Sequence, residues 1–312
     1  MFPAIEARGL RKVYGEKVAV ENLTLTVEMG ETFGFLGPNG AGKTTSMKML
    51  LGLVTPSSGT GRILGFPLDD PRSRQQVGFL PEHLRFPPWM QAAEFLDFTA
   101  RFFKLPTRVR HKRISELLEL VQLQEAAKQP LGTFSKGMLQ RIGLAQALIN
   151  KPKVLFLDEP TSGLDPLGHR LVRQIICYLR EQGTTIFLNS HLLSEVERTC
   201  TRVALIVQGR VRKVIDLTTM TPNTLRVRIK AEPLSENLIQ GLKRWSASIN
   251  VSRTDGTLTL ALSNSKEIPA IARWLISKGI DLYEISPLRD SLEELFIAIV
   301  GEENVPGSPS DQ

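Results

Sequence analysis

Short apolar runs alternate with segments of helical spacing over the first 220 residues of the chain. Glu31–Leu36, Val154–Asp158 and Thr184–Leu188 are runs of strand length. Such runs are typical of strands buried in a parallel sheet, and the segments between them are typical of the helices that cover it. We therefore predict an α/β domain built on a largely parallel sheet over residues 1–220.

One part of this domain has almost only helical spacing. Gln91–Phe103 and Arg113–Leu123 place apolar residues three and four positions apart. Prolines separate these segments, at Pro87, Pro88, Pro106 and Pro130. We predict a helical subdomain inserted into the α/β core at about residues 86–150.

Residues 221–300 follow a different order. The expected elements are a strand at Thr224–Ala231, a helix at Leu234–Trp245, strands at Ile249–Arg253 and Thr257–Ser263, a helix at Ile268–Lys278, a strand at Leu282–Ser286 and a helix at Ser291–Val300. The β-α-β-β-α-β order predicts a small α+β accessory domain of ferredoxin-like topology. The tail, residues 301–312, is rich in Pro, Gly and Ser and is predicted to be disordered.

Composition and charge narrow the class of protein. The hydrophobic fraction of 42% is enough for a substantial core. The N-terminus lacks the apolar segment of a secretory signal, and no apolar run approaches the ~20 residues of a membrane-spanning helix. We expect the two cysteines, Cys177 and Cys200, to be reduced structural thiols.

The formal net charge of +7 is concentrated in the first domain. From Thr221 onward there are ten Lys and Arg against twelve Asp and Glu, which leaves +9 for residues 1–220. A positive balance fits nucleic acid, an anionic membrane surface or an anionic ligand such as ATP. Charge alone leaves these alternatives open.

A phosphate-binding loop follows the strand Glu31–Leu36 and precedes a helix at Thr45–Leu53. Its residues match G-x-x-x-x-G-K-[ST] and are Gly37, Pro38, Asn39, Gly40, Ala41, Gly42, Lys43 and Thr44, with Thr45 next in the helix. Glycines let backbone N–H groups turn toward phosphate oxygens, and the helix N-terminus adds a positive dipole. Lys43 would contact the β- and γ-phosphates, and the Thr44 hydroxyl would contact Mg²⁺.

Two carboxylates end the strand that begins at Val154. A carboxylate at the end of a strand beside a phosphate loop can hold Mg²⁺, and we assign this role to Asp158. Glu159, one residue later, would orient and deprotonate the attacking water. The expected ligands are therefore ATP and Mg²⁺.

Further segments are similar to those of a known family. Phe134-Ser135-Lys136-Gly137-Met138 stands about twenty residues before Asp158, and the stretch from Asp158 to Asp165 reads Asp-Glu-Pro-Thr-Ser-Gly-Leu-Asp. With the phosphate loop, in this order, they resemble the ABC transporter ATPases over essentially all of residues 4–220. The resemblance implies the P-loop NTPase fold of that family. It also implies that Ser135, Lys136 and Gly137, where the family has Leu-Ser-Gly-Gly-Gln, act on ATP held by a second subunit, which Asp165 would contact.

The same resemblance implies roles for three other residues. His191 lies where the family has a switch histidine that contacts the γ-phosphate and Glu159, and Tyr14 lies where an aromatic ring stacks on adenine. Glu82 stands where the family usually has Gln, and we assign it to the metal side of the site. Lys136 and Met138 resemble the signature of an export branch that includes drug-resistance pumps.

The function implied is that of an ATP-hydrolysing subunit that powers export. Its partners would be separate membrane-spanning permease subunits and a second copy of this chain, at the cytoplasmic face of the plasma membrane. The alternative is a soluble ABC ATPase acting on nucleic acid or ribosomes. The strands of residues 221–300 lack the aromatic platforms that stack bases, so we expect no nucleic-acid partner. Another P-loop NTPase, such as a kinase, would leave Ser135–Gly137 and His191 unexplained.

Overall fold

The structure is a computed structural model that describes residues 2–219, 225–246, 248–252, 256–288 and 292–303. It divides into two compact units, Met1–Leu217 and Thr218–Gln312, each described by itself. The first unit ends at Leu217, close to the predicted boundary after residue 220. Of the tail predicted to be disordered, residues 301–303 belong to a helix and residues 304–312 lie outside the described residues.

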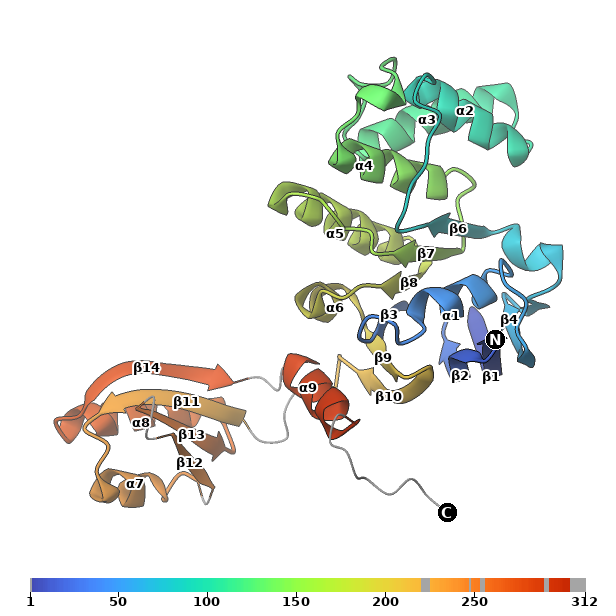
Figure 1. Cartoon of the computed structure of the whole chain (residues 1–312). Coiled ribbons are helices and arrows are strands. Elements are labelled where there is room, and N and C mark those ends of the chain that lie inside the picture. Colours follow the sequence, from blue (N-terminus) through green and yellow to red (C-terminus); the bar gives the residue numbers. More distant parts are fainter. Residues whose placement is uncertain (1, 220–224, 247, 253–255, 289–291, 304–312) are drawn as a thin grey trace. The chain divides into compact units, whose positions relative to one another are not determined.

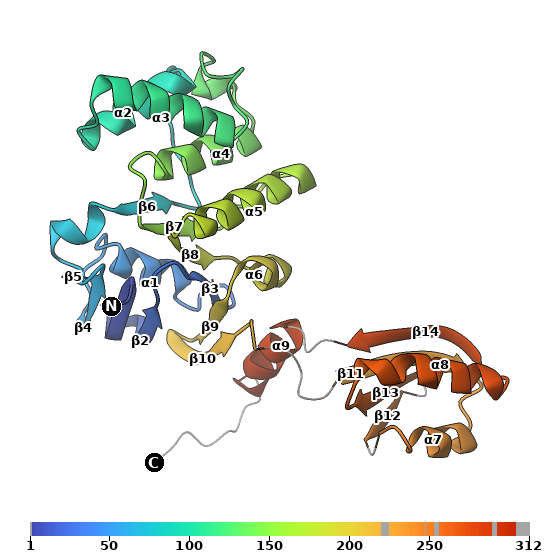
Figure 2. The ribbon, with the colours of Figure 1, turned by 180° about the vertical axis from the view of Figure 1, so that it is seen from behind.

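The first unit is built on a ten-stranded sheet with the order β5-β4-β1-β2-β10-β9-β3-β8-β7-β6. β1, β2, β4 and β5 gather at one end and β6 is the other edge (Figure 2). The strands are β1 (Ile5–Tyr14), β2 (Lys17–Val27), β3 (Thr32–Leu36), β4 (Ser58–Ile63), β5 (Phe66–Pro67), β6 (Val77–Leu80), β7 (Val154–Asp158), β8 (Thr185–Asn189), β9 (Arg202–Val207) and β10 (Arg210–Asp216).

The parallel part of the sheet comprises β9, β3, β8, β7 and β6. Every residue of β3, β7 and β8 is buried, as their continuous apolar runs predicted. The ring of Phe187 in β8 lies 5.8 Å from that of Phe33, 5.3 Å from that of Phe35 and 5.3 Å from that of Phe156. These rings pack together across the three adjacent strands.

The prediction of a largely parallel sheet was wrong for most of the other half, in which only the pair of β2 and β10 is parallel among the described strands. β1 pairs antiparallel with β2 and β4, β4 with β5, and β10 with β9. In β1 and β2, buried residues alternate with half-buried or exposed ones, such as Glu6 and Thr24 respectively. That alternation is typical of antiparallel strands with one solvated face. The sheet is therefore mixed.

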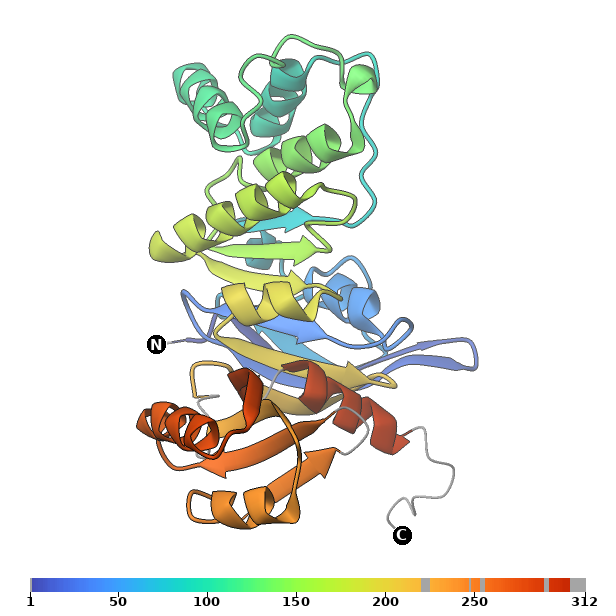
Figure 3. The same cartoon turned by 90° about the vertical axis from the view of Figure 1, so that its left-hand side faces the viewer.

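Helices cover both faces of the parallel strands. α1 (Lys43–Leu50) packs its Met47, Met49 and Leu50 into the core shared with β1, β2 and β3. α5 (Pro166–Glu181) and α6 (Leu193–Thr199) cover the opposite face, beside β8 and β3 (Figure 3). A 3₁₀ helix, η1 (Pro71–Arg74), precedes β6.

A group of helices lies beyond the β6 edge (Figure 1). It comprises α2 (Ala92–Phe102), α3 (Thr107–Leu120), the 3₁₀ helix η2 (Leu131–Thr133) and α4 (Lys136–Ala147). α3 begins six residues earlier than the predicted start at Arg113. Its first turns are mostly polar and exposed, so apolar spacing gave no sign of them.

The second unit contains a four-stranded antiparallel sheet with the order β12-β13-β11-β14. Its elements are β11 (Leu225–Glu232), α7 (Glu236–Leu242), β12 (Ile249–Ser252), β13 (Thr257–Leu262), the 3₁₀ helix η3 (Ser265–Glu267), α8 (Ile268–Ser277), β14 (Asp281–Leu288) and α9 (Leu292–Glu303). Apolar residues of α7 and α8 share a core with alternate residues of the strands. The order matches the predicted β-α-β-β-α-β arrangement.

Candidate active site

The phosphate-binding loop occupies residues 37–42, between the end of β3 and the start of α1. At Gly37 a Cβ atom would lie 2.2 Å from the carbonyl oxygen of Ile206 in β9, so a side chain has no room there. Gly42 has φ 98° and directly precedes α1. Both positions require glycine, since one faces a neighbouring strand and the other has a left-handed backbone. Asn39 and Gly40 are exposed at the tip, and Pro38, Thr44 and Thr45 are half-buried.

Lys43 lies inside this loop. Its Nζ donates hydrogen bonds to the carbonyl oxygens of Gly37, at 2.7 Å, and Pro38, at 3.1 Å. Burial lowers the pKa of Lys43, while the carboxylates of Glu159 and Asp158 act in the opposite direction. The ammonium group is therefore near the carboxylates across the site, and the loop's own carbonyls orient it.

Asp158 is the last residue of β7 and lies opposite Asn189, the last residue of β8. The Asn189 amide donates a hydrogen bond from Nδ2 to Oδ1 of Asp158. Asp158 is 3% exposed, and this burial raises its pKa although the Asn189 hydrogen bond favours the ionised form. The Oδ1 atom of Asn189 is buried and has no partner among the described residues.

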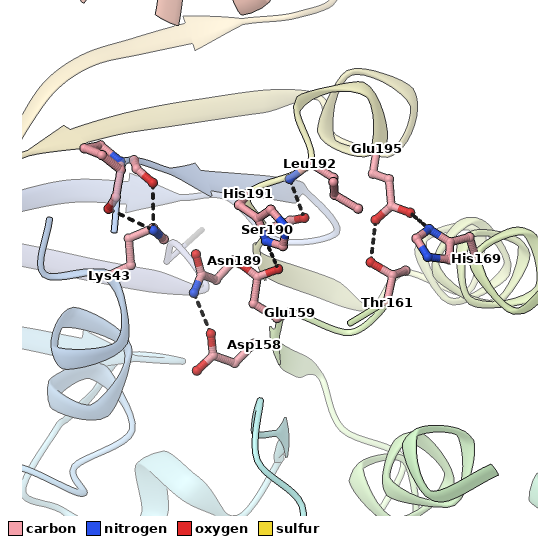
Figure 4. Close-up of polar contacts among 12 residues, drawn as sticks. Lys43, Asp158, Glu159, Thr161, His169, Asn189, Ser190, His191, Leu192 and Glu195 are labelled. Carbon is pink, nitrogen blue, oxygen red and sulfur yellow. Dashed lines mark hydrogen bonds and ion pairs between the residues drawn. The ribbon is translucent and has the colours of Figure 1, made fainter. Parts of the chain in front are cut away.

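Glu159 directly follows β7 and has φ 50°, which is rare for a residue other than glycine. Its backbone N–H donates to the carbonyl of Asn189 at 2.9 Å. Its carboxylate lies 2.7 Å from His191, between Oε2 and Nδ1 (Figure 4). Burial raises the pKa of Glu159, and His191 opposes that shift. A carboxylate with a raised pKa, beside an imidazole that is 59% exposed, is suited to accept a proton from water.

The burial of Asp158 predicts a stability effect. Its pKa is raised in the folded chain, so between the ordinary carboxyl pKa of about 4 and the raised value only the unfolded chain loses the proton, and stability falls as pH rises. Asp158→Asn removes this cost. We expect the nucleotide-free variant to melt at a higher temperature than the parent, with a larger difference at pH 8 than at pH 5. Asp69→Asn, at an exposed position, is the control. If Asp158→Asn melts at pH 8 at the same temperature as the parent or lower, burial of the ionised Asp158 carboxylate does not cost stability.

The signature segment lies at the start of α4. Ser135 is its N-cap, with Oγ accepting from the backbone N–H of Met138 at 3.2 Å. Ser135 and Lys136 are exposed, and Gly137 is half-buried. The Lys136 side chain lies against Gly163, since a Cβ atom on Gly163 would be 2.5 Å from the Lys136 Nζ. The signature and the turn after β7 are therefore neighbours within one chain.

Asp165 is the N-cap of α5, and its Oδ1 accepts from the backbone N–H of Gly168 at 2.7 Å. It shares a cavity of about 430 Å³ with Ser135, Lys136 and Gly137. No residue of the phosphate loop lines this cavity. The structure thus groups the four residues that we expect to act on a second subunit, apart from the loop of their own chain.

Two predicted site residues lie on the surface. Tyr14 ends β1 and is 48% exposed, with the Lys12 Nζ 5.0 Å from the centre of its ring. Glu82 follows β6 and is exposed. Its negative charge acts on the pKa of both Asp158 and Lys43.

Sequence reasoning missed several polar residues around the site. Asn189 was identifiable in principle, because it ends the strand beside the one that carries Asp158. Glu195 was not identifiable. It lies in a short helix, yet its carboxylate contacts both Thr161 and His169. No spacing rule connects those three positions.

The chain resembles known proteins along its length. The sequence profile of the family described as ABC transporter matches residues 20–162. An uncharacterized ABC transporter ATP-binding protein of Nostoc sp. is 42% identical over 92% of this chain and 87% of that protein. The bacitracin transport ATP-binding protein of Bacillus licheniformis is 34% identical over 96% of this chain and 98% of that protein.

A solved structure agrees with the first unit. It is the dimeric structure of an ATP-binding cassette in a post-hydrolysis state, bound to ADP and Pi. It is 25% identical to this chain, with a TM-score of 0.63 over 68% of this chain and 98% of that one. With the long matches above, this confirms the resemblance read from the motifs, and the chain belongs to the family of ABC transporter ATP-binding proteins.

Proposed function

We propose that this chain hydrolyses ATP to power export through separate membrane-spanning subunits. The observation that carries the proposal is the convergence of three elements at the carboxyl ends of β3, β7 and β8. These are the phosphate loop with Lys43, the buried Asp158, and the Glu159–His191 pair. Family membership supports ATP as the nucleotide.

The loop would bind the phosphates of ATP. The backbone N–H groups at the start of α1 and the Lys43 ammonium, which is bonded within the loop, both favour an anion. Pro38, Asn39, Gly40 and Ala41 belong to the loop, Thr45 lies in the first turn of α1, and Tyr14 would stack on the adenine ring. Binding then requires Lys43 to exchange its two loop carbonyls for phosphate oxygens.

The expected Mg²⁺ position would draw on few protein groups. The described part of the chain has no group of three or more His, Cys, Asp or Glu side chains that could hold a metal. This fits Mg²⁺, which is commonly held by one or two protein oxygens with phosphate and water. The Thr44 hydroxyl and the Asp158 carboxylate, oriented by Asn189, would hold it, with Glu82 nearby. The ion would neutralise charge that develops on the phosphate oxygens.

Glu159 would act as the general base. Its carboxylate would accept a proton from the water that attacks the γ-phosphate, and its raised pKa brings it nearer to neutral pH. The His191 Nδ1 lies 2.7 Å from the Glu159 carboxylate and would orient it, and the exposed His191 ring would reach the γ-phosphate.

A second copy of the chain would complete the site. Ser135, Lys136, Gly137 and Asp165 lie together on the surface and away from their own phosphate loop. A helix N-terminus with an added lysine suits the γ-phosphate of ATP bound by a partner. The dimeric cassette with bound ADP and Pi supports this arrangement as a homodimer.

The membrane partner is supported by the relatives. Among similar proteins are a bacitracin transport ATP-binding protein and a linearmycin resistance ATP-binding protein, and this chain spans 98% of each. No helix in the described ranges is long and apolar enough to cross a membrane. We therefore place the chain at the cytoplasmic face of the plasma membrane, bound to permease subunits.

Purification from solubilised membranes tests this proposal. The full-length chain is expected to co-purify with a multi-span membrane protein in a fixed ratio, and the complex is expected to hydrolyse ATP faster than the chain alone. The Glu159→Gln chain should co-purify equally well, because binding a permease does not need hydrolysis. Recovery of the chain only from the soluble fraction would contradict the proposal.

A further inference from the structure

A partly buried cluster of three side chains, Thr161, His169 and Glu195, lies near the Glu159–His191 pair. Glu195, in the first turn of α6, accepts a hydrogen bond from the Thr161 hydroxyl at 2.8 Å through Oε2, and its Oε1 lies 2.6 Å from Nδ1 of His169. Figure 4 shows the carboxylate between these two side chains. Thr161 is 3% exposed and the Glu195 side chain 14%. One carboxylate oxygen therefore contacts the turn after β7, and the other contacts α5.

The cluster connects the same two segments as the Glu159–His191 pair. Thr161 comes two residues after Glu159, and Glu195 comes four residues after His191. We call residues 159–165 the catalytic turn and residues 189–195 the histidine segment. Two side-chain contacts, from Glu159 and from Thr161, thus join the catalytic turn to the histidine segment, and His169 adds a third contact from α5.

The backbone of the catalytic turn needs such support. Glu159 has φ 50°, a left-handed conformation that costs free energy in a residue with a side chain. Such a conformation persists only where the surrounding contacts over-determine it. Within the turn, Ser162 N–H donates to the Glu159 carbonyl at 3.1 Å and Leu164 N–H to the Thr161 carbonyl at 3.1 Å. These two bonds shape the turn internally. The Glu159 N–H also donates to the Asn189 carbonyl at 2.9 Å, which ties the first residue of the turn to the histidine segment, and the Thr161 hydroxyl makes the next such contact two residues later.

We propose that Glu195 is a positioning residue for hydrolysis, which holds the catalytic turn against the histidine segment through Thr161. The inference rests on the proposed role of Glu159. Loss of this contact would let the turn move, and the Glu159 carboxylate would leave the attacking water. A displacement of about 1 Å can lower a rate by about 100-fold. The phosphate loop makes no contact with Glu195 in the described hydrogen bonds, so ATP binding would not change.

Thr161 offers the sharpest test, because its hydroxyl can be removed with little change in shape. In the full-length protein, Thr161→Val is expected to lower kcat about tenfold or more while KM for ATP stays within about twofold. Thr161→Ser keeps the hydroxyl and should retain parental turnover. Glu195→Ala should also lower kcat. The double variant Thr161→Val, Glu195→Ala should be no slower than the slower single variant, because the two substitutions remove the same Thr161–Glu195 contact.

Thr199→Val is the matched control. Thr199 is 3% exposed in the same helix, and its hydroxyl donates to the Glu195 backbone carbonyl at 2.6 Å. This substitution removes a buried hydroxyl from α6 without touching the Glu195 carboxylate, so kcat should stay at the parental value. An equal fall in kcat for Thr199→Val would show general loosening of α6 and would overturn the proposal.

Three other outcomes would also overturn it: unchanged kcat in Thr161→Val, a Thr161→Ser variant as slow as Thr161→Val, or singles whose effects multiply in the double variant. The comparison of Thr161→Val with Thr161→Ser tests the positioning role even if Glu195→Ala does not fold. The proposed function is tested separately, by ATP hydrolysis in the parent and by its loss in Glu159→Gln. A positive result there with parental kcat in Thr161→Val would reject the positioning role alone.

Discussion

Glu159→Gln is expected to lower the steady-state rate of ATP hydrolysis about 10³-fold while ATP still binds. Glutamine keeps the shape of the side chain and an acceptor oxygen for His191, but its amide cannot take a proton from water. Two contacts made by Glu159 itself help to position this group, the backbone bond to Asn189 and the 2.7 Å contact with His191. The loss should therefore appear in kcat, with the dissociation constant of ATP within a few-fold of the parental value.

Phosphate release and nucleotide titration measure the two quantities. The exposed Glu181→Gln, at the end of α5, is the matched control and should hydrolyse at the parental rate. If the site is completed across a dimer, Glu159→Gln with Mg-ATP should also sediment as a dimer, because bound ATP is no longer consumed. Steady hydrolysis at the parental rate in Glu159→Gln would remove Glu159 from the mechanism.

The second large effect is expected at the phosphate loop, where Lys43→Met should weaken ATP binding about 100-fold. A hydrogen bond between charged groups contributes about 1.5–3 kcal/mol, and methionine supplies neither charge nor donor. Without nucleotide the change should cost little stability. The variant loses the bonds to Gly37 and Pro38, but it also loses the cost of burying the ammonium group, which lowers the Lys43 pKa.

Lys48→Met is the natural comparison, because Lys48 lies in the last turn of the same helix and is exposed. Titration with a fluorescent ATP analogue should give parental affinity for Lys48→Met. Equal, small losses of affinity in both variants would mean that the loop binds nucleotide through general positive charge and not through Lys43.

Much of the parallel half of the fold was predictable. β3, β7 and β8 are continuous apolar runs because they are buried on both faces, and such runs are visible without any tertiary information. The antiparallel half was harder to predict. The alternation in β1 and β2 is interrupted by register shifts, at Ala7 and Leu10 among others, which break the two-residue period that marks such strands.

The site divides in the same way. Gly37 and Gly42 were predictable because close approach and a left-handed backbone leave glycine as the only residue that fits. The Thr161–Glu195 contact was not, since the residues are 34 positions apart and meet only after α5 and α6 pack on the sheet. Their residue types are ordinary for a turn and a helix.

The position of β8 in the sheet affects how much conformational entropy the chain loses when it binds nucleotide. It lies between β3, which leads into the phosphate loop, and β7, which ends at Asp158, and it is paired and buried along its whole length. The distance between the phosphate-binding and carboxylate sides of the site is therefore set when the sheet folds. ATP meets two partners that are already in place, and only side chains such as Lys43 must rearrange. Within one chain, the backbone of the site therefore loses little conformational entropy on binding, which is the thermodynamic advantage of preorganisation.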